Sequence, residues 1–188
     1  MNVRPLFLAV SAIAALVAAD PGKPATLPVN VHSDGAKPQW IPSGYMGETS
    51  AIAMDDKSTD KPHSGATSLK VTYSKGDGWG GVVWQDPVND WGGKAGGWNL
   101  TGAKALKFWA RGAVGGEKVK FGFGVIGADQ PFPDTGKKEL SVTLTPEWSE
   151  HAIDVAGLDL TRIKTGFMWV VAGQGAAVCF HLDDVRWE

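Results

Sequence analysis

The sequence predicts an all-β fold in which two antiparallel sheets pack face to face. Short stretches that alternate apolar and polar residues recur about every 8–15 residues, as strands of a sandwich do. Turn residues separate them, and the chain has 25 glycines. No amphipathic helix of the kind that connects parallel strands intervenes. With 188 residues, 43% of them hydrophobic, the chain is long enough to bury the core of one domain.

The first four strand candidates differ in how clearly they alternate. Residues 29–33 place two valines on one face, and residues 50–54 form a short second candidate. Residues 68–73 read SLKVTY, in which every second residue is apolar or aromatic. Residues 81–85 are apolar and include Trp84. Because successive side chains of a strand point to opposite faces, such alternation predicts one buried face.

The second half of the chain continues the pattern. Residues 106–111 place Leu106 and Phe108 on the face opposite Trp109. In residues 119–126, Phe121 and Phe123 share the predicted core face. The remaining candidates are residues 140–144, 153–155, 167–172 and 178–187.

The first 19 residues are typical of a secretory signal peptide. One positive charge, Arg4, precedes a 14-residue apolar run over residues 6–19. This run is shorter than the roughly 20 residues that a membrane span needs, and it ends in small residues. We therefore expect residues 1–19 to be removed, residues 20–28 to form a proline-containing flexible leader, and residues 29–188 to form the domain. The mature protein would be secreted or periplasmic, with no membrane span.

Charge and cysteine content exclude several classes. The formal net charge is −2 and no basic run follows the chain, so nucleic-acid binding is disfavoured. Cys179 is the only cysteine, so no intrachain disulfide forms.

Tryptophan is concentrated between residues 76 and 102. Four of the nine tryptophans lie there among glycines and polar residues: Trp79, Trp84, Trp91 and Trp98. One core layer cannot hold all of them, so we expect some indoles to be exposed. An exposed indole stacks on the C–H face of a sugar ring, while neighbouring amides and carboxylates bind its hydroxyls. Alternatively, these side chains plug the ends of the sandwich.

The middle strands extend this prediction. If Phe121 and Phe123 face the core, Gly122 and Gly124 leave a smooth outer floor, which often marks close approach of a ligand. Alternatively, these glycines mark a bulge or a strong twist of the strand. We expect Trp109 and Arg111 on that same face. The predicted carbohydrate site comprises Trp79, Trp84, Gln85, Trp91, Trp109, Arg111, Asp134, Trp169 and Gln174.

The last strand changes phase. Phe180 and Leu182 are out of register with Val185 and Trp187, so we predict a β-bulge at Asp183 and its neighbour. A carboxylate there favours a calcium ion as partner. A solvated bulge or a pair with an arginine is the alternative.

Several segments resemble jelly-roll carbohydrate-binding modules of the galactose-binding-like fold, especially family 11-like modules and related secreted bacterial proteins. They are FHLDDVRW at residues 180–187, PHSGATSLKVTY at 62–73, LTGAKALKFWARG at 100–112 and WSEHAIDV at 148–155. The resemblance implies a concave face for glucan-type chains and a structural calcium. It implies Asp183 as one calcium ligand, with a partner among Asp34, Glu48 and Asp55.

These observations predict a non-catalytic module that binds a β-glucan-like polysaccharide, working beside separate secreted glycoside hydrolases. One alternative is a glycan hydrolase on the same sandwich, which needs two carboxyl groups across a groove. Another is an envelope protein whose tryptophans face a protein partner. The acids available to the hydrolase are Asp86, Asp90, Asp129 and Asp134.

Overall fold

A computed structural model describes residues 21–188, so the predicted signal peptide, 1–19, lies outside the described residues. This part of the chain is built of strands and one short 3₁₀ turn, Thr49–Ala51. The strands are β1 (Lys23–Pro24), β2 (Val29–His32), β3 (Ile41–Gly47), β4 (Ile52–Ser58), β5 (Ser68–Tyr73), β6 (Trp79–Gln85), β7 (Trp98–Asn99), β8 (Ala105–Gly112), β9 (Lys118–Phe123), β10 (Lys138–Thr143), β11 (Ser149–Asp154), β12 (Thr165–Ala172) and β13 (Val178–Trp187).

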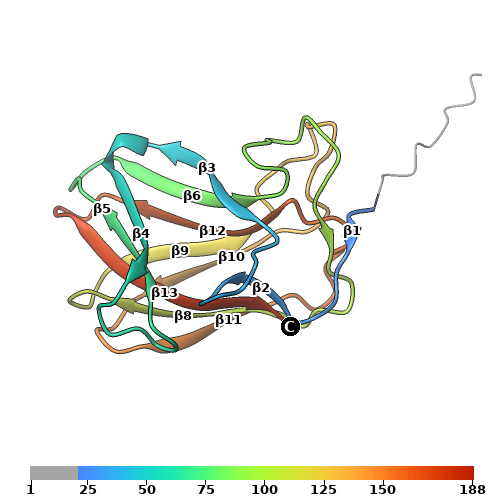
Figure 1. Cartoon of the computed structure of the whole chain (residues 1–188). Helices are drawn as coiled ribbons and strands as arrows, with labels where there is room; N and C mark the ends of the chain where they lie inside the picture. The colour runs from blue at the N-terminus through green and yellow to red at the C-terminus, as the bar shows by residue number, and fades with distance from the viewer. Residues whose placement is uncertain (1–20) are drawn as a thin grey trace, which may run out of the picture.

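Two antiparallel sheets form the layers of a sandwich (Figure 1). One has five strands in the order β10-β9-β12-β6-β3. The other has the order β11-β8-β13-β5-β4, and β2 pairs with β13. The predicted all-β, two-sheet architecture is therefore confirmed. Between residues 21 and 188 we find no helix with the length and apolarity to cross a membrane.

Aromatic rings from both sheets meet in the core. Phe108 on β8 lies 4.6 Å from Phe121 on β9 and 5.6 Å from Phe167 on β12, between ring centroids. All three side chains are buried. The alternation predicted for residues 106–111 and 119–126 thus places the expected side chains inside.

The bulge in the last strand is present. The register of β13 against β8 shifts between Asp183 and Arg186, and Asp184 adopts a left-handed backbone with φ of 48°. The extra residue lets Leu182 and Val185 both reach the core, where they are buried.

Strand β3 was not predicted. Its sequence, IPSGYMG, has the composition of a turn, but it forms the edge of the five-stranded sheet. Its register against β6 shifts between Pro42 and Gly44. Proline and a bulge are tolerated at an edge because one side of the strand needs no ladder hydrogen bonds.

The described part of the predicted leader lies against the domain. Strand β1 pairs in parallel with β7, and the Gly22 N–H donates to the Thr161 carbonyl at 2.9 Å. The Lys23 ammonium lies 2.9 Å from an Asp86 carboxylate oxygen. Residues 21–28 are therefore docked, in contrast to the free leader expected from their prolines.

Candidate functional site

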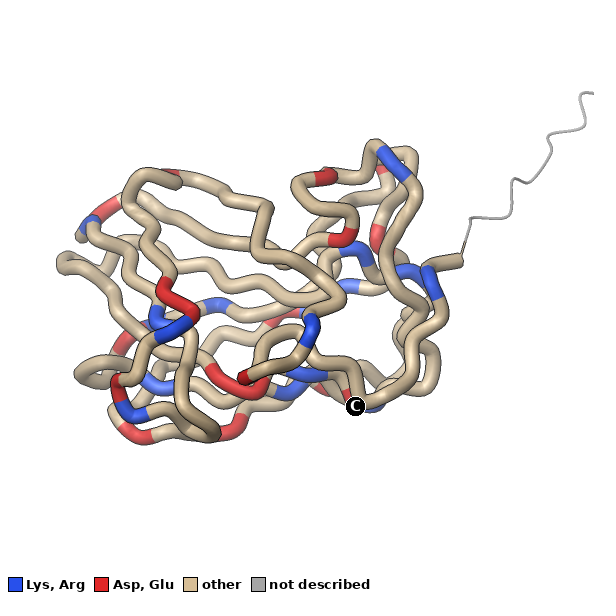
Figure 2. The backbone as a smooth tube through the Cα atoms, viewed as in Figure 1, with Lys and Arg blue, Asp and Glu red and all other residues tan. Residues whose placement is uncertain are grey.

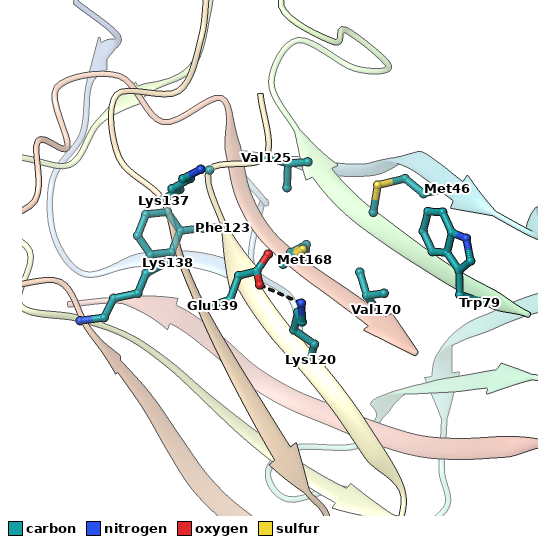
Figure 3. Close-up of a pocket in the computed structure, with 11 residues that line it drawn as sticks. Met46, Trp79, Lys120, Phe123, Val125, Lys137, Lys138, Glu139, Met168 and Val170 are labelled. Carbon is teal, nitrogen blue, oxygen red and sulfur yellow. Dashed lines mark ion pairs between the residues drawn. The ribbon is translucent and has the colours of Figure 1, made fainter. Parts of the chain in front are cut away.

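The outer face of the five-stranded sheet carries a hollow of about 580 Å³. Its apolar half comes from Trp79 on β6, Met46 on β3, and Met168 and Val170 on β12 (Figure 3). The Trp79 side chain is 47% exposed, and Met46 lies beside it (Figure 3). An indole presented in this way offers a flat apolar surface to a ligand.

Charged side chains form the other half of this hollow. Lys120 on β9 forms an ion pair of 2.9 Å with Glu139 on β10 (Figure 3). Lys137, just before β10, directs its amine toward the hollow, whereas the Lys138 amine turns away and donates to the Asp154 carbonyl at 2.7 Å (Figure 3). One side of the hollow therefore suits apolar ring faces and the other suits polar groups.

Two further hollows continue the first across the same sheet. One of about 360 Å³ shares Lys120 and Val170 with it. Another of about 490 Å³ shares Lys118 and Ala172 with the second and reaches Gln174. We call these three adjoining hollows the trough. Its extent suits a chain of several units better than a single small molecule.

Glycine backbone lies directly beneath the exposed indole of Trp79. Gly47 at the end of β3 has φ of +68°, and a Cβ added there would lie 2.9 Å from the indole Cδ2 of Trp79. The ring therefore rests directly on glycine backbone, a close approach that a side chain would prevent.

Two loops, residues 86–97 and 125–136, stand together at one end of the sandwich (Figure 1). The Phe132 N–H in one donates to the Gly92 carbonyl in the other at 3.0 Å. Beneath them, the buried ammonium of Lys164 pairs with Asp90 and donates to the Lys94 carbonyl at 2.5 Å. Burial alone would raise the pKa of Asp90, but the hydrogen bond and charge of Lys164 hold it below its usual range.

Replacing Lys164 with methionine should destabilise the protein by about 3 kcal/mol, because Asp90 would keep a largely buried charge without its partner. Chemical denaturation monitored by fluorescence measures this loss. The double variant that also carries Asp90→Asn should recover a large part of it. Equal stability of the single variant and the wild type would contradict a buried pair.

Both carboxylate oxygens of Asp134 accept hydrogen bonds from backbone N–H groups of the same loop structure. One carboxylate oxygen accepts from the Lys164 and Thr165 N–H groups at 2.6 and 3.0 Å, and the other from the Ile126 N–H at 2.9 Å. Burial raises the pKa of this carboxyl. Asp134 therefore orders the loops, and its prediction as a sugar-binding rim residue is wrong.

Two of the predicted stacking residues are in the core. Trp169 on β12 is fully buried, and Trp84 on β6 is 2% exposed. Trp169 pairs with Val82 and Phe121, whose side chains face inward, so its indole also points into the core. Trp84 lies two residues after Val82 on β6 and therefore faces the same way. Strand β6 is buried on both faces after its first residue, so its apolar run carried no alternation that could distinguish Trp84 from its neighbours.

Gln85 and Trp91 lie together at the loop end of the outer face. Gln85 is fully buried, accepts from the Ser43 hydroxyl and donates to the Asp90 carbonyl, so it is not an open rim residue. Trp91 is partly exposed and lies over Gly44, where an added Cβ would be 2.9 Å from its ring. Gln174 is exposed at the far end of the trough, and its amide binds the backbone of Lys118.

Gly122 does face outward, but it does not form an open floor. A Cβ added there would lie 2.9 Å from the Cε of Met168, which covers it. Gly124 lines the first hollow.

The predicted site lacked Met46, Met168, Val170 and the lysines. Only the lysines of β9 had a clear signal, since Lys118 and Lys120 alternate with core residues.

Trp109 and Arg111 share an outer face as predicted, but on the opposite side of the molecule. They lie on β8 in the six-stranded sheet, whereas Gly122 lies on β9 in the five-stranded one. His63 stacks on Trp109 with ring centroids 3.8 Å apart, and Arg111 donates to the Asp60 carbonyl at 2.6 Å. The loop that follows β4 therefore covers both residues, which take no part in the trough.

His181 beneath this loop makes stability depend on pH. Burial, reinforced by the charge of Arg111, lowers its pKa to about 4 from 6.5, while Asp60 opposes the shift. As pH falls from 6.5 to 4, the unfolded chain takes up a proton that the folded state does not. The free energy of unfolding should therefore decrease by about 3 kcal/mol over this window and lose nothing further from His181 below it.

Urea denaturation at pH 7 and pH 4 measures this decrease. A His181→Asn variant is the control, since all other titrating groups stay in place. It should lose less stability than the wild type between the two pH values. An identical loss in both proteins would contradict the assignment.

The acids predicted for calcium do not come together. Asp34 accepts the Ala66 N–H at 2.6 Å, and Asp183 accepts the His63 N–H at 3.0 Å, so both fasten the loop after β4. Asp55 is exposed and accepts the Lys57 N–H. The hydrogen bond from the Thr67 hydroxyl lowers the pKa of Asp34, whereas burial raises that of Asp183.

What gathers around Asp183 instead is an imidazole and a second carboxylate, from His63 and Asp184, with ligand atoms within 4.8 Å of one another. Calcium takes six to eight oxygen ligands. A nitrogen ligand, and N–H donors already directed at Asp183, do not fit that requirement. Asp183 does not form one ligand group with Asp34 or Asp55, so the described residues support no calcium site built from these acids.

Comparison with solved structures identifies the fold. The family 11 carbohydrate-binding module of the cellulosomal cellulase Lic26A-Cel5E of Clostridium thermocellum superposes with a TM-score of 0.58 at 14% identity, over 87% of this chain and 95% of that one. A family 30 module gives 0.56 at 17% identity, over 86% and 87%. A variant family 29 module in complex with cellohexaose gives 0.51 at 13%, over 85% and 89%.

The chain has the jelly-roll fold of carbohydrate-binding modules. The resemblance to family 11 modules is thus confirmed for the fold. No protein-family model and no curated protein matches the sequence. Identities below 20% show the jelly-roll sandwich alone.

Proposed function

We propose that this protein binds a polysaccharide in the trough, without cleaving it. The observation that carries this proposal is the exposed indole of Trp79 at one end of a trough that crosses the outer face of a sheet. A flat chain of the β-glucan type would stack a sugar ring on Trp79 and lie along Met168 and Val170. Its hydroxyls would bind the polar side formed by Lys120 and Glu139.

The fold and the positions of the acids support this function. Structures with the same fold are carbohydrate-binding modules, one of them in complex with cellohexaose. Of the acids that a hydrolase would need, Asp86, Asp90 and Asp134 are bound to donors within the loops. We also propose, from residues 1–19, that the protein is exported and acts beside separate glycoside hydrolases.

Isothermal titration against a panel of soluble polysaccharides tests the proposal. Mixed-linked β-glucan, xyloglucan and xylan supply flat β-linked chains, and a starch-type α-glucan supplies a coiled one as the control. We expect heat of binding with at least one β-linked chain and retarded migration in a gel that contains it. Absence of both effects with every polysaccharide would contradict the proposal.

A further inference from the structure

The lysines that line the trough outnumber its carboxylates. Lys118, Lys120 and Lys137 line it, and Glu139 is the carboxylate among its lining residues. Glu139 pairs with Lys120. The amines of Lys118 and Lys137 have no ion-pair partner within residues 21–188.

This excess contrasts with the rest of the protein. The whole chain has a formal net charge of −2, and residues of both signs are scattered over its loops (Figure 2). The other two lysines of this region have partners, since Lys120 pairs with Glu139 and the Lys138 amine donates to the Asp154 carbonyl. Two ammonium groups without ion-pair partners, on a sheet face that also carries an exposed indole, therefore form a local positive field that favours anionic ligands.

The spacing of the two amines distinguishes a chain from a single anion. Lys118 pairs with Thr143 at one end of the β9–β10 ladder, and Lys137 precedes Lys138 at the other end. Lys137 is six residues from Thr143 along the chain, so at a rise of about 3.3 Å per residue the two backbones lie roughly 20 Å apart. One small anion cannot contact both amines. A chain that carries a carboxylate on successive rings can.

We infer that the ligand of the trough is an acidic β-linked polysaccharide, whose rings carry uronate carboxylates. This inference rests on the proposed function and specifies its ligand. Ring faces stack on Trp79, and carboxylates pair with Lys118 and Lys137. A single-stranded nucleic acid is a poorer match, because such sites stack successive bases on several aromatic side chains, whereas the lining of the trough offers the one exposed indole of Trp79.

The experiment compares two hexasaccharides that differ only at C6: β-1,4-linked glucuronan, which carries carboxylates, and cellohexaose, which carries hydroxymethyl groups. Titration at low salt should show about ten-fold tighter binding of the glucuronan. The advantage should shrink when sodium chloride is raised, because salt screens exposed charges. The Lys118→Gln, Lys137→Gln double variant should lose about two- to five-fold per lysine for the glucuronan and little for cellohexaose.

Lys104→Gln is the matched control, since Lys104 is an exposed lysine that does not line the trough. It should bind like the wild type. Equal affinity for the two hexasaccharides, or an equal loss in the control variant, would overturn the inference while leaving the proposed function standing. Tighter binding of oligothymidylate than of glucuronan would also overturn it. Failure of both hexasaccharides and of every polysaccharide in the panel would instead contradict the proposed function.

Discussion

Replacing Trp79 with alanine should weaken polysaccharide binding by about thirty-fold or more, with little change in stability. Aromatic anchors of binding sites commonly contribute about 2 kcal/mol or more. The Trp79 indole rests on Gly47 at the edge of the trough and is 47% exposed, so little core packing is lost with it. Titration of the variant with the best polysaccharide of the panel measures the effect, and thermal melting checks the fold.

Trp109→Ala provides the matched control for Trp79→Ala. Trp109 lies on the opposite sheet, stacked against His63. Its removal should lower stability through lost packing but leave affinity unchanged. If Trp109→Ala lost as much affinity as Trp79→Ala, the ligand site would lie on the six-stranded sheet and the trough would be excluded.

Replacing Trp169 with alanine should destabilise the protein by about 4 kcal/mol. The Trp169 indole is fully buried and packs at 5.6 Å against Phe180 of the opposite sheet. Removing a core tryptophan loses its transfer free energy and leaves a cavity. Denaturant unfolding measures the loss. At a temperature where the variant stays folded, its affinity for the polysaccharide should equal that of the wild type, because the ring does not reach the trough.

A pair of milder substitutions separates packing from hydrogen bonding. The Nε1–H of Trp187 donates to the Gly166 carbonyl at 2.9 Å, whereas that of Trp169 is buried with no partner within the described residues. Trp187→Phe leaves a buried carbonyl unpaired, and Trp169→Phe removes an unsatisfied donor. Trp187→Phe should therefore be less stable than Trp169→Phe by about 1–3 kcal/mol. The reverse order would contradict the hydrogen-bond assignment.

The fold could be predicted because its signals are local. Alternation in residues 68–73 and 106–111 predicts which side chains face inward. The phase change at Asp183 predicts the bulge that the structure contains. Strand β3 escaped prediction, since an edge strand tolerates the proline and glycine that otherwise indicate a turn. The docking of residues 21–28 depends on contacts with loops more than 60 residues away.

The candidate site was predicted only in part, because local alternation cannot say which sheet a strand joins. Trp109 was correctly placed outside, but on the wrong side of the sandwich, since β8 and β9 are consecutive in sequence and belong to different sheets. Trp84 and Trp169 were placed outside although they pack inside. Trp79, at the start of β6, is the exposed tryptophan that lines the trough.

By itself the sequence determined the sandwich class, the buried faces of its regular strands and an excess of indole over what one core layer holds. The tertiary structure alone decided which indoles are exposed, and that Lys118, Lys120 and Lys137 lie along the same face as Trp79. The physical reason is that side-chain direction within a strand follows from neighbours one or two residues away. A binding surface, in contrast, is assembled from strands whose pairing depends on long-range packing.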